Sequence, residues 1–356
     1  LTSSVPPSGD GSFTYRWFRS TDDITYNPVP GALNETYSPG ILTQDTWFYR
    51  EVTATLGSGS CPAVTNKVLI TVNNFLPGSL DADQTICEGD KPAVIGGVSP
   101  SGDGMNYTYQ WYESADGTVF TEITGATDET FDPPVLNADT WYKRAVTSHL
   151  NGNECTRETA PERIWVINFV PGTIGEDQTI CDNTAPLPFT GTAPTGDGTF
   201  TFSWEYSLDG SAWHPVPGIN TATYAAPVLT ADTWYRRIVT SELNSHTCSK
   251  ATAPVRVTVI NFVPGSISTN QTICEGDTPA PFGSIAASGD GTFTYQWQSS
   301  INGSDFSNIV GETDETYAAG PLMADTWYRR QVTAELNGRT CSAVTTAIRM
   351  TVNNVT

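Results

Sequence analysis

The most regular hydrophobic pattern in the chain is a short alternation of aromatic and polar residues. Phe13, Tyr15 and Trp17 are separated by Thr14 and Arg16. Period-two alternation is typical of a β-strand with one buried face. The pattern returns three times, as Tyr107/Tyr109/Trp111, Phe200/Phe202/Trp204 and Phe293/Tyr295/Trp297. The chain therefore repeats one strand at a nearly constant spacing.

Other markers repeat with the same period. The string Ser8-Gly9-Asp10-Gly11 returns at Ser101, Thr195 and Ser288, at offsets of 93, 94 and 93 residues. A fixed period of this length indicates tandem copies of one domain. We predict four domains, modules 1 to 4, at residues 1–74, 75–168, 169–261 and 262–356. Module 1 lacks the opening segment of the others, so we expect the chain to be a window on a longer array.

Each copy is predicted to consist of strands alone. The aromatic strand is followed by hairpin turns and by a strand expected around Tyr37, Phe131, Tyr224 and Tyr317. A Leu-x-x-Asp-Thr-Trp motif then leads into the longest strand, and a Val-rich strand closes the copy. About seven short strands in 93 residues predict an all-β module built as a β-sandwich. Short Phe-x-Pro-Gly junctions are stiff, so the modules are expected to form an elongated rod.

The spacing of Trp and Tyr residues resembles an immunoglobulin-like (Ig-like) sandwich. A central Trp is followed by Leu-x-x-Asp-Thr-x-Tyr, which implies a tyrosine corner at Tyr142, Tyr235 and Tyr328, while module 1 has Phe48 there. The second core Cys of that fold is replaced by arginine. These arginines are Arg144, Arg237 and Arg330.

A longer set of motifs resembles a more specific group. Asp-Gln-Thr-Ile-Cys, Tyr-Gln-Trp, Thr-Trp-Tyr-Arg-Arg and a later Cys are similar to the Ig-like (PKD-like) repeats of large secreted surface proteins of Bacteroidota-type bacteria. That group includes gliding-motility adhesins exported by the type IX secretion route. The resemblance covers the whole chain and implies a cell-surface stalk or adhesin, not an enzyme.

Charge and hydropathy exclude several partners. The formal net charge is −21, so the chain lacks the basic face that nucleic acid requires. The same charge argues against docking on anionic lipid. No apolar run approaches 18 residues, so we expect no membrane insertion.

The seven cysteines fall at two recurring positions. One follows Gln-Thr-Ile and the other precedes the last strand. Bonds across a junction would have to span a last strand of roughly 40 Å, whereas a disulfide needs Cα atoms within about 7 Å. We therefore predict bonds within modules, with buried free thiols as the alternative. The pairs are Cys87–Cys155, Cys181–Cys248 and Cys274–Cys341, and Cys61 is left unpaired by truncation.

Recurring disulfides favour an oxidising, extracellular compartment. No C-x-x-C spacing or His pair indicates zinc. Acidic residues at the junctions are a possible calcium site, because Ca²⁺ prefers oxygen ligands. Those residues are Asp81, Asp83, Glu176 and Asp177. The recurring Asp of the Gly-Asp-Gly loop is more simply a turn residue.

One tryptophan recurs on the longest strand and is a candidate ligand platform. Facing outward, it would stack on sugar rings; we favour instead packing against arginines such as Arg237 or Arg330, or against the rim of the core. The four positions are Trp47, Trp141, Trp234 and Trp327.

We interpret the sequence as a non-enzymatic extracellular stalk or adhesin segment on a bacterial cell surface, supporting adhesion or gliding motility. The three His residues share no repeat position, so no catalytic device is indicated, and no cofactor is expected apart from possible calcium. Expected partners are neighbouring repeats, surface glycans and outer-membrane motility or secretion machinery. The alternatives are a carbohydrate-binding array of a secreted polysaccharide-degrading protein and a structural surface filament.

Overall fold

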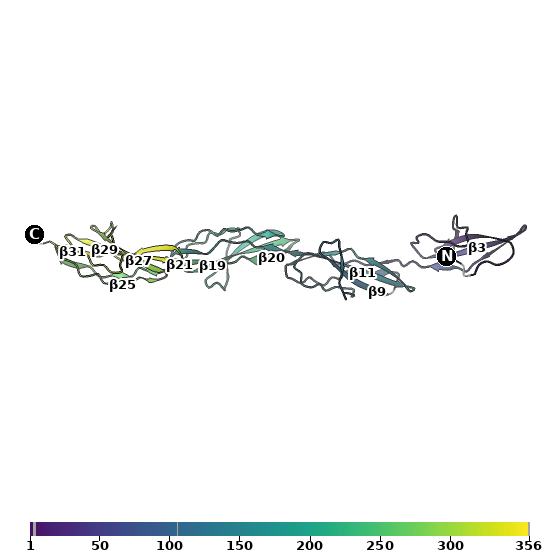
Figure 1. Ribbon diagram of the computed structural model, residues 1–356, viewed down its shortest axis with the longest axis horizontal. Coiled ribbons are helices and arrows are strands. Elements are labelled where there is room, and N and C mark those ends of the chain that lie inside the picture. Colours follow the sequence, from purple (N-terminus) through teal and green to yellow (C-terminus); the bar gives the residue numbers. More distant parts are fainter. Residues whose placement is uncertain (3–4, 105, 355–356) are drawn as a thin grey trace. The chain divides into compact units, whose positions relative to one another are not determined.

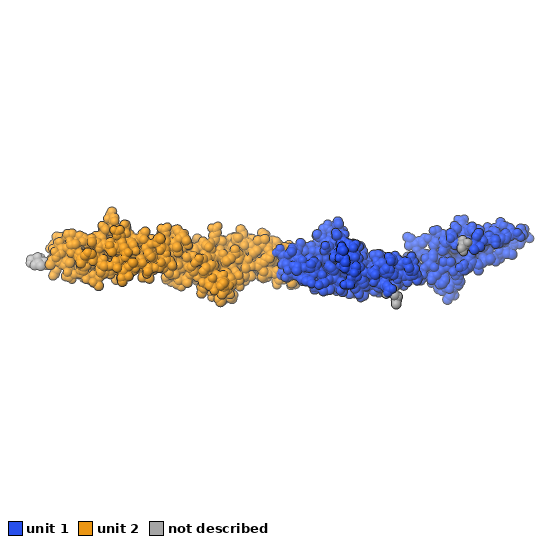
Figure 2. Space-filling model, turned by 60° about the horizontal axis from the view of Figure 1, so that its bottom comes forward, with its two compact units in different colours: residues 1–166 blue, residues 167–356 orange. Residues whose placement is uncertain are grey.

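The structure is a computed structural model that describes residues 1–2, 5–104 and 106–354. The described residues form strands β1 to β31, labelled in part in Figure 1. They divide into two compact units, residues 1–166 and 167–356 (Figure 2). None of the described residues forms a helix long and apolar enough to cross a membrane.

Module 3 shows the plan of the main sheet. Its strand order is β15-β21-β19-β17-β18, and the central strand β19 is the longest. The first part of β19 pairs with β21, whereas its last six residues pair with β20 in a hairpin. The first strand β15 runs parallel to the last strand β21. The bounds are β15 (Gln178–Cys181), β17 (Thr199–Ser207), β18 (His214–Val216), β19 (Thr233–Leu243), β20 (His246–Ala251) and β21 (Val255–Ile260).

Modules 2 and 4 repeat this sheet, and module 1 has its counterpart without the first strand. Module 1 contains β1 (Ser12–Ser20), β2 (Asn27–Pro28), β3 (Thr46–Leu56), β4 (Gly59–Val64) and β5 (Val68–Ile70). Module 2 contains β7 (Gln84–Cys87), β9 (Asn106–Ser114), β10 (Thr121–Glu122), β11 (Thr140–Leu150), β12 (Asn153–Glu158) and β13 (Glu162–Ile167). Module 4 contains β24 (Gln271–Cys274), β27 (Thr292–Ser300), β28 (Ser307–Asn308), β29 (Thr326–Leu336), β30 (Arg339–Val344) and β31 (Ile348–Asn353).

Short strand pairs start the later modules. The junction strands are β6 (Phe75–Leu76), β14 (Phe169–Val170) and β22 (Phe262–Val263). They pair with the Gly-Asp-Gly loops at β8 (Ser101–Gly102), β16 (Thr195–Gly196) and β26 (Ser288–Gly289), and β23 (Ser266–Ile267) pairs with β25 (Ser284–Ile285).

The second layer of each sandwich is reduced to short segments over the sheet face. The strand expected around Phe131 and Tyr224 is present only as isolated bridges, to Ile95 and Phe189. These residues pack against the Trp and Tyr of the main sheet. The all-β, tandem Ig-like sandwich architecture is therefore confirmed, with a second layer less regular than the sequence predicted.

The alternating aromatic strand places one Trp at the centre of each core. Trp111, Trp204 and Trp297 are fully buried. The indole Nε1 of Trp204 donates a hydrogen bond to the carbonyl of Thr221 at 2.9 Å, so its polar atom is satisfied. The equivalent bond recurs in every module, to Asn34, Asp128 and Asp314.

An arginine lies directly opposite this Trp on the longest strand and is also buried. The pairs are Trp17–Arg50, Trp111–Arg144, Trp204–Arg237 and Trp297–Arg330, and each arginine is at most 2% exposed. The guanidinium of Arg330 donates to the carbonyls of Pro264 and Ile285 at 3.0 and 2.9 Å. It lies 4.9 Å from the ring centre of Tyr295. Where an Ig domain has a cystine, this module therefore joins its layers with a cation that binds backbone oxygens.

Burial has an electrostatic cost for these arginines. Loss of hydration lowers the pKa of Arg144, Arg237 and Arg330 below the usual value. The carbonyls of the junction prolines Pro77, Pro171 and Pro264 accept bonds from these side chains. In modules 2, 3 and 4, the arginine at the centre of the core thus holds the start of the module in place.

The expected tyrosine corner is wrong in one respect. Tyr142 is fully buried, but its hydroxyl has no hydrogen-bond partner among the described residues, whereas a tyrosine corner requires a bond to the backbone. Burial raises the pKa of Tyr142, Tyr235 and Tyr328 to about 12. The ring is therefore used as core volume, which agrees with Phe48 in module 1.

Module 2 carries one anomaly in its core. Glu162 occupies the position of Val255 and Ile348 and is 1% exposed. Gln84 donates to its Oε1 at 3.1 Å, but its Oε2 has no partner among the described residues. Burial, with the charges of Asp81 and Asp83, raises the pKa of Glu162 to about 7 although the bond from Gln84 opposes this.

We predict that Arg330→Met destabilises module 4 by about 3–5 kcal/mol, because carbonyls buried around the guanidinium lose their donors. Hydrogen exchange of the β29 amides in the full chain measures this. The matched control is Arg329→Met on the opposite face of β29, which should cost less than about 1 kcal/mol. Equal effects of the two substitutions would contradict the role assigned to Arg330.

We also predict that module 2 loses stability as the pH rises. Folding favours protonated Glu162, so its contribution is complete below pH 4.5 and is lost through pH 7. The loss between pH 5 and pH 8 should be about 2–3 kcal/mol. Hydrogen exchange in β11 at the two pH values checks it, and Glu162→Val should remove the dependence. A slope that persists in Glu162→Val would exclude this carboxyl as its source.

Candidate functional site

The most distinctive site is the junction between modules, and its first component is the Gly-Asp-Gly loop. Asp197 accepts a hydrogen bond from the backbone amide of Asn168 at 2.9 Å, and its own amide donates to the carbonyl of Asn168. Asp103 binds Asn74 and Asp290 binds Asn261 in the same way. The recurring Asp thus clamps the junction to the following module, which agrees with a turn role.

The junction Phe belongs to the following module as well. Phe262 packs on Phe293 with ring centres 5.9 Å apart, and Phe169 packs on Phe200 at 5.7 Å. Aromatic pairs at this separation are favourable beyond their buried area. The junction is therefore a built part of each module rather than a loose tether.

The second component is the hairpin β29–β30, which extends from module 4 onto the first strand of module 3. Asn337 in its turn donates through Nδ2 to Oγ1 of Thr179 at 3.2 Å. Asn337 has a φ of 51°, a left-handed conformation that Asn tolerates in tight turns. The hairpin thus reaches across a module boundary inside residues 167–356.

A disulfide joins the two modules at this contact. Cys181 at the end of β15 is bonded to Cys341 in β30, with Cα atoms 5.6 Å apart and a sequence separation of 160 residues. Cys341 is 5% exposed. Ile260, Ala334 and Cys341 form a buried cluster, and Cys181, Phe262 and Leu336 pack against it. The site is a closed apolar contact with a covalent bond at its edge.

The predicted pairing of cysteines within modules is wrong. Cys181 is level with Ile260 at the end of β21, whereas Cys248 pairs with Ser241 near the far end of β19. At about 3.3 Å per residue, these places lie about 35 Å apart in one module, so Cys181–Cys248 cannot form. The bond joins the end of one module to the hairpin of the next.

The remaining predictions for cysteine need the same correction. Cys61, Cys155 and Cys274 are free and exposed, so Cys61 is not the only unpaired thiol and neither Cys87–Cys155 nor Cys274–Cys341 forms. Cys87 and Cys248 are both disulfide-bonded. The paired positions were predicted from the sequence, but the bonding pattern was not.

The acidic residues proposed for calcium mostly bind backbone amides. Asp81 accepts from Gly96 at 2.8 Å, and Asp83 accepts from Arg163 at 2.8 Å. Asp177 accepts from Arg256 at 2.7 Å, and Asn270 holds the equivalent place in module 4. A neutral amide therefore does the same work as the carboxylate. Glu176 is exposed and, within the described residues, belongs to no group of three potential metal ligands.

The candidate tryptophan platforms lie on the sheet face opposite the core, and arginines cover three of them. Arg163 lies 4.4 Å from the ring centre of Trp141, while Arg256 and Arg349 lie 4.9 Å from Trp234 and Trp327. These arginines lie on the last strand, and each is the direct partner of its Trp in the pairing with the longest strand. Arg237 and Arg330, which were expected to pack on the tryptophans, lie in the core instead.

Further contacts hold these tryptophans in place. Asp139 binds Arg163, Asp232 binds Arg256 and Asp325 binds Arg349. The hairpin glycine Gly117 adopts a φ of 72°, and a side-chain carbon added there would lie 3.0 Å from the indole of Trp141. Trp47 faces Leu69 instead of an arginine. The geometry supports packing rather than an open sugar platform at Trp141, Trp234 and Trp327.

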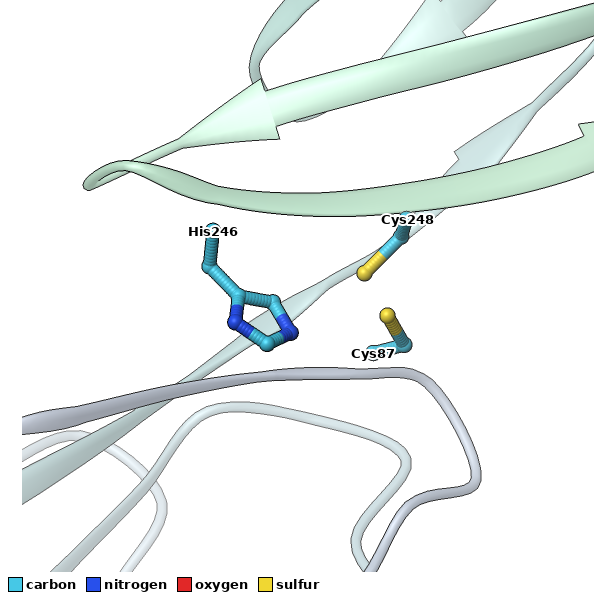
Figure 3. A group of neighbouring side chains, drawn as sticks. All are labelled: Cys87, His246 and Cys248. Atoms are coloured by element: carbon cyan, nitrogen blue, oxygen red, sulfur yellow. The ribbon is translucent and has the colours of Figure 1, made fainter.

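Figure 3 shows the side chains of Cys87, His246 and Cys248. His246 and Cys248 are two residues apart on β20 and leave the same face of the strand. Both cysteines are disulfide-bonded, so neither provides the thiolate that zinc requires.

Comparison with known proteins identifies the module. A family described as "Domain of unknown function (DUF8696)" matches residues 1–74, 76–167, 170–261 and 263–354. No curated protein sequence matches the chain.

Three solved structures illustrate a distant similarity. Three N-terminal domains of the outer capsid protein Hoc of bacteriophage RB49 are 15% identical, covering 79% of this chain and all of that one, with a TM-score of 0.37. Four Ig domains of Dscam1 are 14% identical, covering 95% and 91%, with a TM-score of 0.26. Extracellular domains 3–5 of Drosophila OTK are 14% identical, covering 78% and 96%, with a TM-score of 0.28.

We predict that peptide mapping without reductant recovers Cys181–Cys341. Iodoacetamide should label Cys61, Cys155 and Cys274 in the native chain, because these thiols are exposed, and should leave Cys87 and Cys248 unlabelled. Recovery of a Cys181–Cys248 peptide would contradict the placement of these residues at opposite ends of the module.

Proposed function

We propose that this chain, which belongs to the family described as "Domain of unknown function (DUF8696)", is a load-bearing, non-enzymatic segment of an extracellular protein. The observation that carries the proposal is the Cys181–Cys341 bond between successive modules. A covalent bond at a domain boundary has little use in a freely jointed tether, but it prevents two modules from being pulled apart.

The strand topology supports the same function. In modules 3 and 4 the first strand is parallel to the last strand, as β15 with β21 and β24 with β31. Tension on the two ends of a module then slides these strands past one another. All their hydrogen bonds are loaded together, so resistance is greater than for strands that separate one bond at a time.

Disulfides favour an extracellular setting because cytosolic thiols are kept reduced. The resemblance of the repeats to those of gliding-motility adhesins leads us to propose a stalk on a bacterial surface that supports adhesion or gliding motility. Neighbouring repeats are its first partners. Outer-membrane motility or secretion machinery and surface glycans are proposed as partners of the larger protein.

The carbohydrate-binding alternative requires the recurrent tryptophans to be accessible. The arginines over Trp141, Trp234 and Trp327 occupy a position that a sugar ring would need. These side chains are held by Asp139, Asp232 and Asp325, so moving them would break an ion pair in each module. We therefore favour the spacer role.

We predict that single-molecule stretching of the full chain depends on reductant. With the disulfide intact, the load crosses the bond, so most of the segment between Cys181 and Cys341 is not extended. Reduction should lengthen the fully stretched chain by at least about 55 nm, the span of 160 residues at about 3.5 Å each.

Replacing the three free cysteines Cys61, Cys155 and Cys274 by Ser provides the control, because it prevents new pairings and leaves the native bond. Equal final extensions with and without reductant would overturn the load-bearing role of the bond.

A further inference from the structure

On module 3, the hairpin β29–β30 of module 4 covers the ends of the first and last strands. The equivalent surface of module 4 is not covered by a hairpin of the residues that the structure describes. We name this surface the acceptor face; it comprises Thr272, Ile273, Cys274, Val352 and Asn353. We propose that the acceptor face is a docking site for the β-hairpin of another module of the same family, with Cys274 as its disulfide partner.

The exposure of equivalent residues supports the assignment. On module 3, Ile180 is 7% exposed and Ile260 is 1% exposed beneath the hairpin. Of their counterparts on module 4, Ile273 is half-buried and Asn353 is exposed. Cys274 is a free, exposed thiol. The strands themselves are alike, since β24 pairs with β31 in the register of β15 with β21. The two faces therefore differ by the presence of a cover, not by their fold.

The covering element defines the partner. In β30 the bonded Cys341 is buried, whereas the equivalent strands β4 and β12 are exposed along their whole length and carry the free Cys61 and Cys155. The hairpin Cys is thus buried in β30, which covers the equivalent face of module 3, and exposed in β4 and β12. A hairpin with Cys at the position of Cys341 is the complement that the acceptor face lacks.

A second position makes the partner more specific. At one junction Asn73 donates through Nδ2 to Oγ of Ser148 at 3.1 Å. At another, Ile260 packs with Ala334 in an apolar cluster. The polar Asn73 thus meets a hydroxyl, whereas the apolar Ile260 at the same place is matched with Ala334. The apolar Ile167 is matched with Ser241, whose hydroxyl donates to the carbonyl of Asp197 instead. Because β31 ends in Asn353, at the place that Asn73 holds before the first junction, the acceptor face should prefer a hairpin with Ser at the position of Ala334.

The physical reason is the cost of an unpaired amide. Asn353 would be covered by the hairpin as Ile260 is, and a buried amide without a hydrogen-bond partner is strongly unfavourable. A serine hydroxyl supplies the partner, as Ser148 does for Asn73. An alanine methyl group cannot.

Bond formation requires an oxidant. Two thiols become one disulfide and release two protons and two electrons, which a small disulfide such as oxidised glutathione accepts to become two thiols. Docking aligns the sulfurs, and exchange with this oxidant completes the bond.

The test extends the full chain by one module. Residues 75–167 are fused after Asn354, in place of the last two residues, which reproduces the Val-Asn-Asn-Phe sequence of residues 72–75. The native Cys155 is replaced by Ser so that only the added copy carries this thiol; after treatment with oxidised glutathione, peptide mapping should then recover Cys274 bonded to the Cys155 of the added copy. Iodoacetamide labelling of Cys274 should fall at least about tenfold relative to the 356-residue chain.

Two variants of the added copy separate docking from bonding. With Cys155→Ser there, Cys274 stays a thiol, but the docked hairpin should still slow its labelling. With Ser148→Ala there, protection should weaken, because Asn353 loses its partner.

Two results would overturn the docking site. One is unchanged labelling of Cys274 in the fused chain, and the other is bonding of Cys274 to Cys61 as often as to the added Cys155. Equal protection of Cys274 by the unmodified copy and by the copy with Ser148→Ala would overturn the specificity assigned to Asn353.

Discussion

A buried guanidinium with backbone oxygens as its acceptors is the constraint on which each module depends. From one position on the longest strand, this arginine donates to three parts of its module: the junction proline, the second layer, and the segment just before Phe131, Tyr224 or Tyr317. The arginines are Arg144, Arg237 and Arg330. A cation in a low-dielectric core is costly unless its donors are satisfied, so the backbone oxygens around its terminal amino groups must keep their geometry. The Nε atoms of these arginines have no partner among the described residues. The second layer can be irregular because this side chain, rather than a strand ladder, positions it.

The same side chain links the core to the junction. The carbonyl of Pro264 binds Arg330, the amide of Asn261 binds Asp290, and Phe262 packs on Phe293. The start of module 4 is thus held from three directions. This places the hairpin β29–β30 against module 3, where Cys341 meets Cys181. Stability of an array with such contacts includes a term for each interface as well as for each module.

Much of the module could be predicted from local pattern. The period of 93 or 94 residues, the core Trp and the cysteine positions recur in the chain itself. The uses of Tyr142, Glu162 and the outward Trp residues could not be predicted, because each depends on side chains from distant strands. Trp141 is an example: the pattern places it on the outer face, but only strand pairing brings Arg163 over its ring.

The sequence by itself determined the repeat, the all-β class and the central Trp of each core, because these follow from periodicity and side-chain chemistry. Only the tertiary structure decided how the cysteines pair. The parallel arrangement of β15 and β21 carries Cys181 to the end of its module opposite Cys248. Strand direction is a non-local property, set by the packing of the whole sheet, so no spacing between Cys residues reveals it.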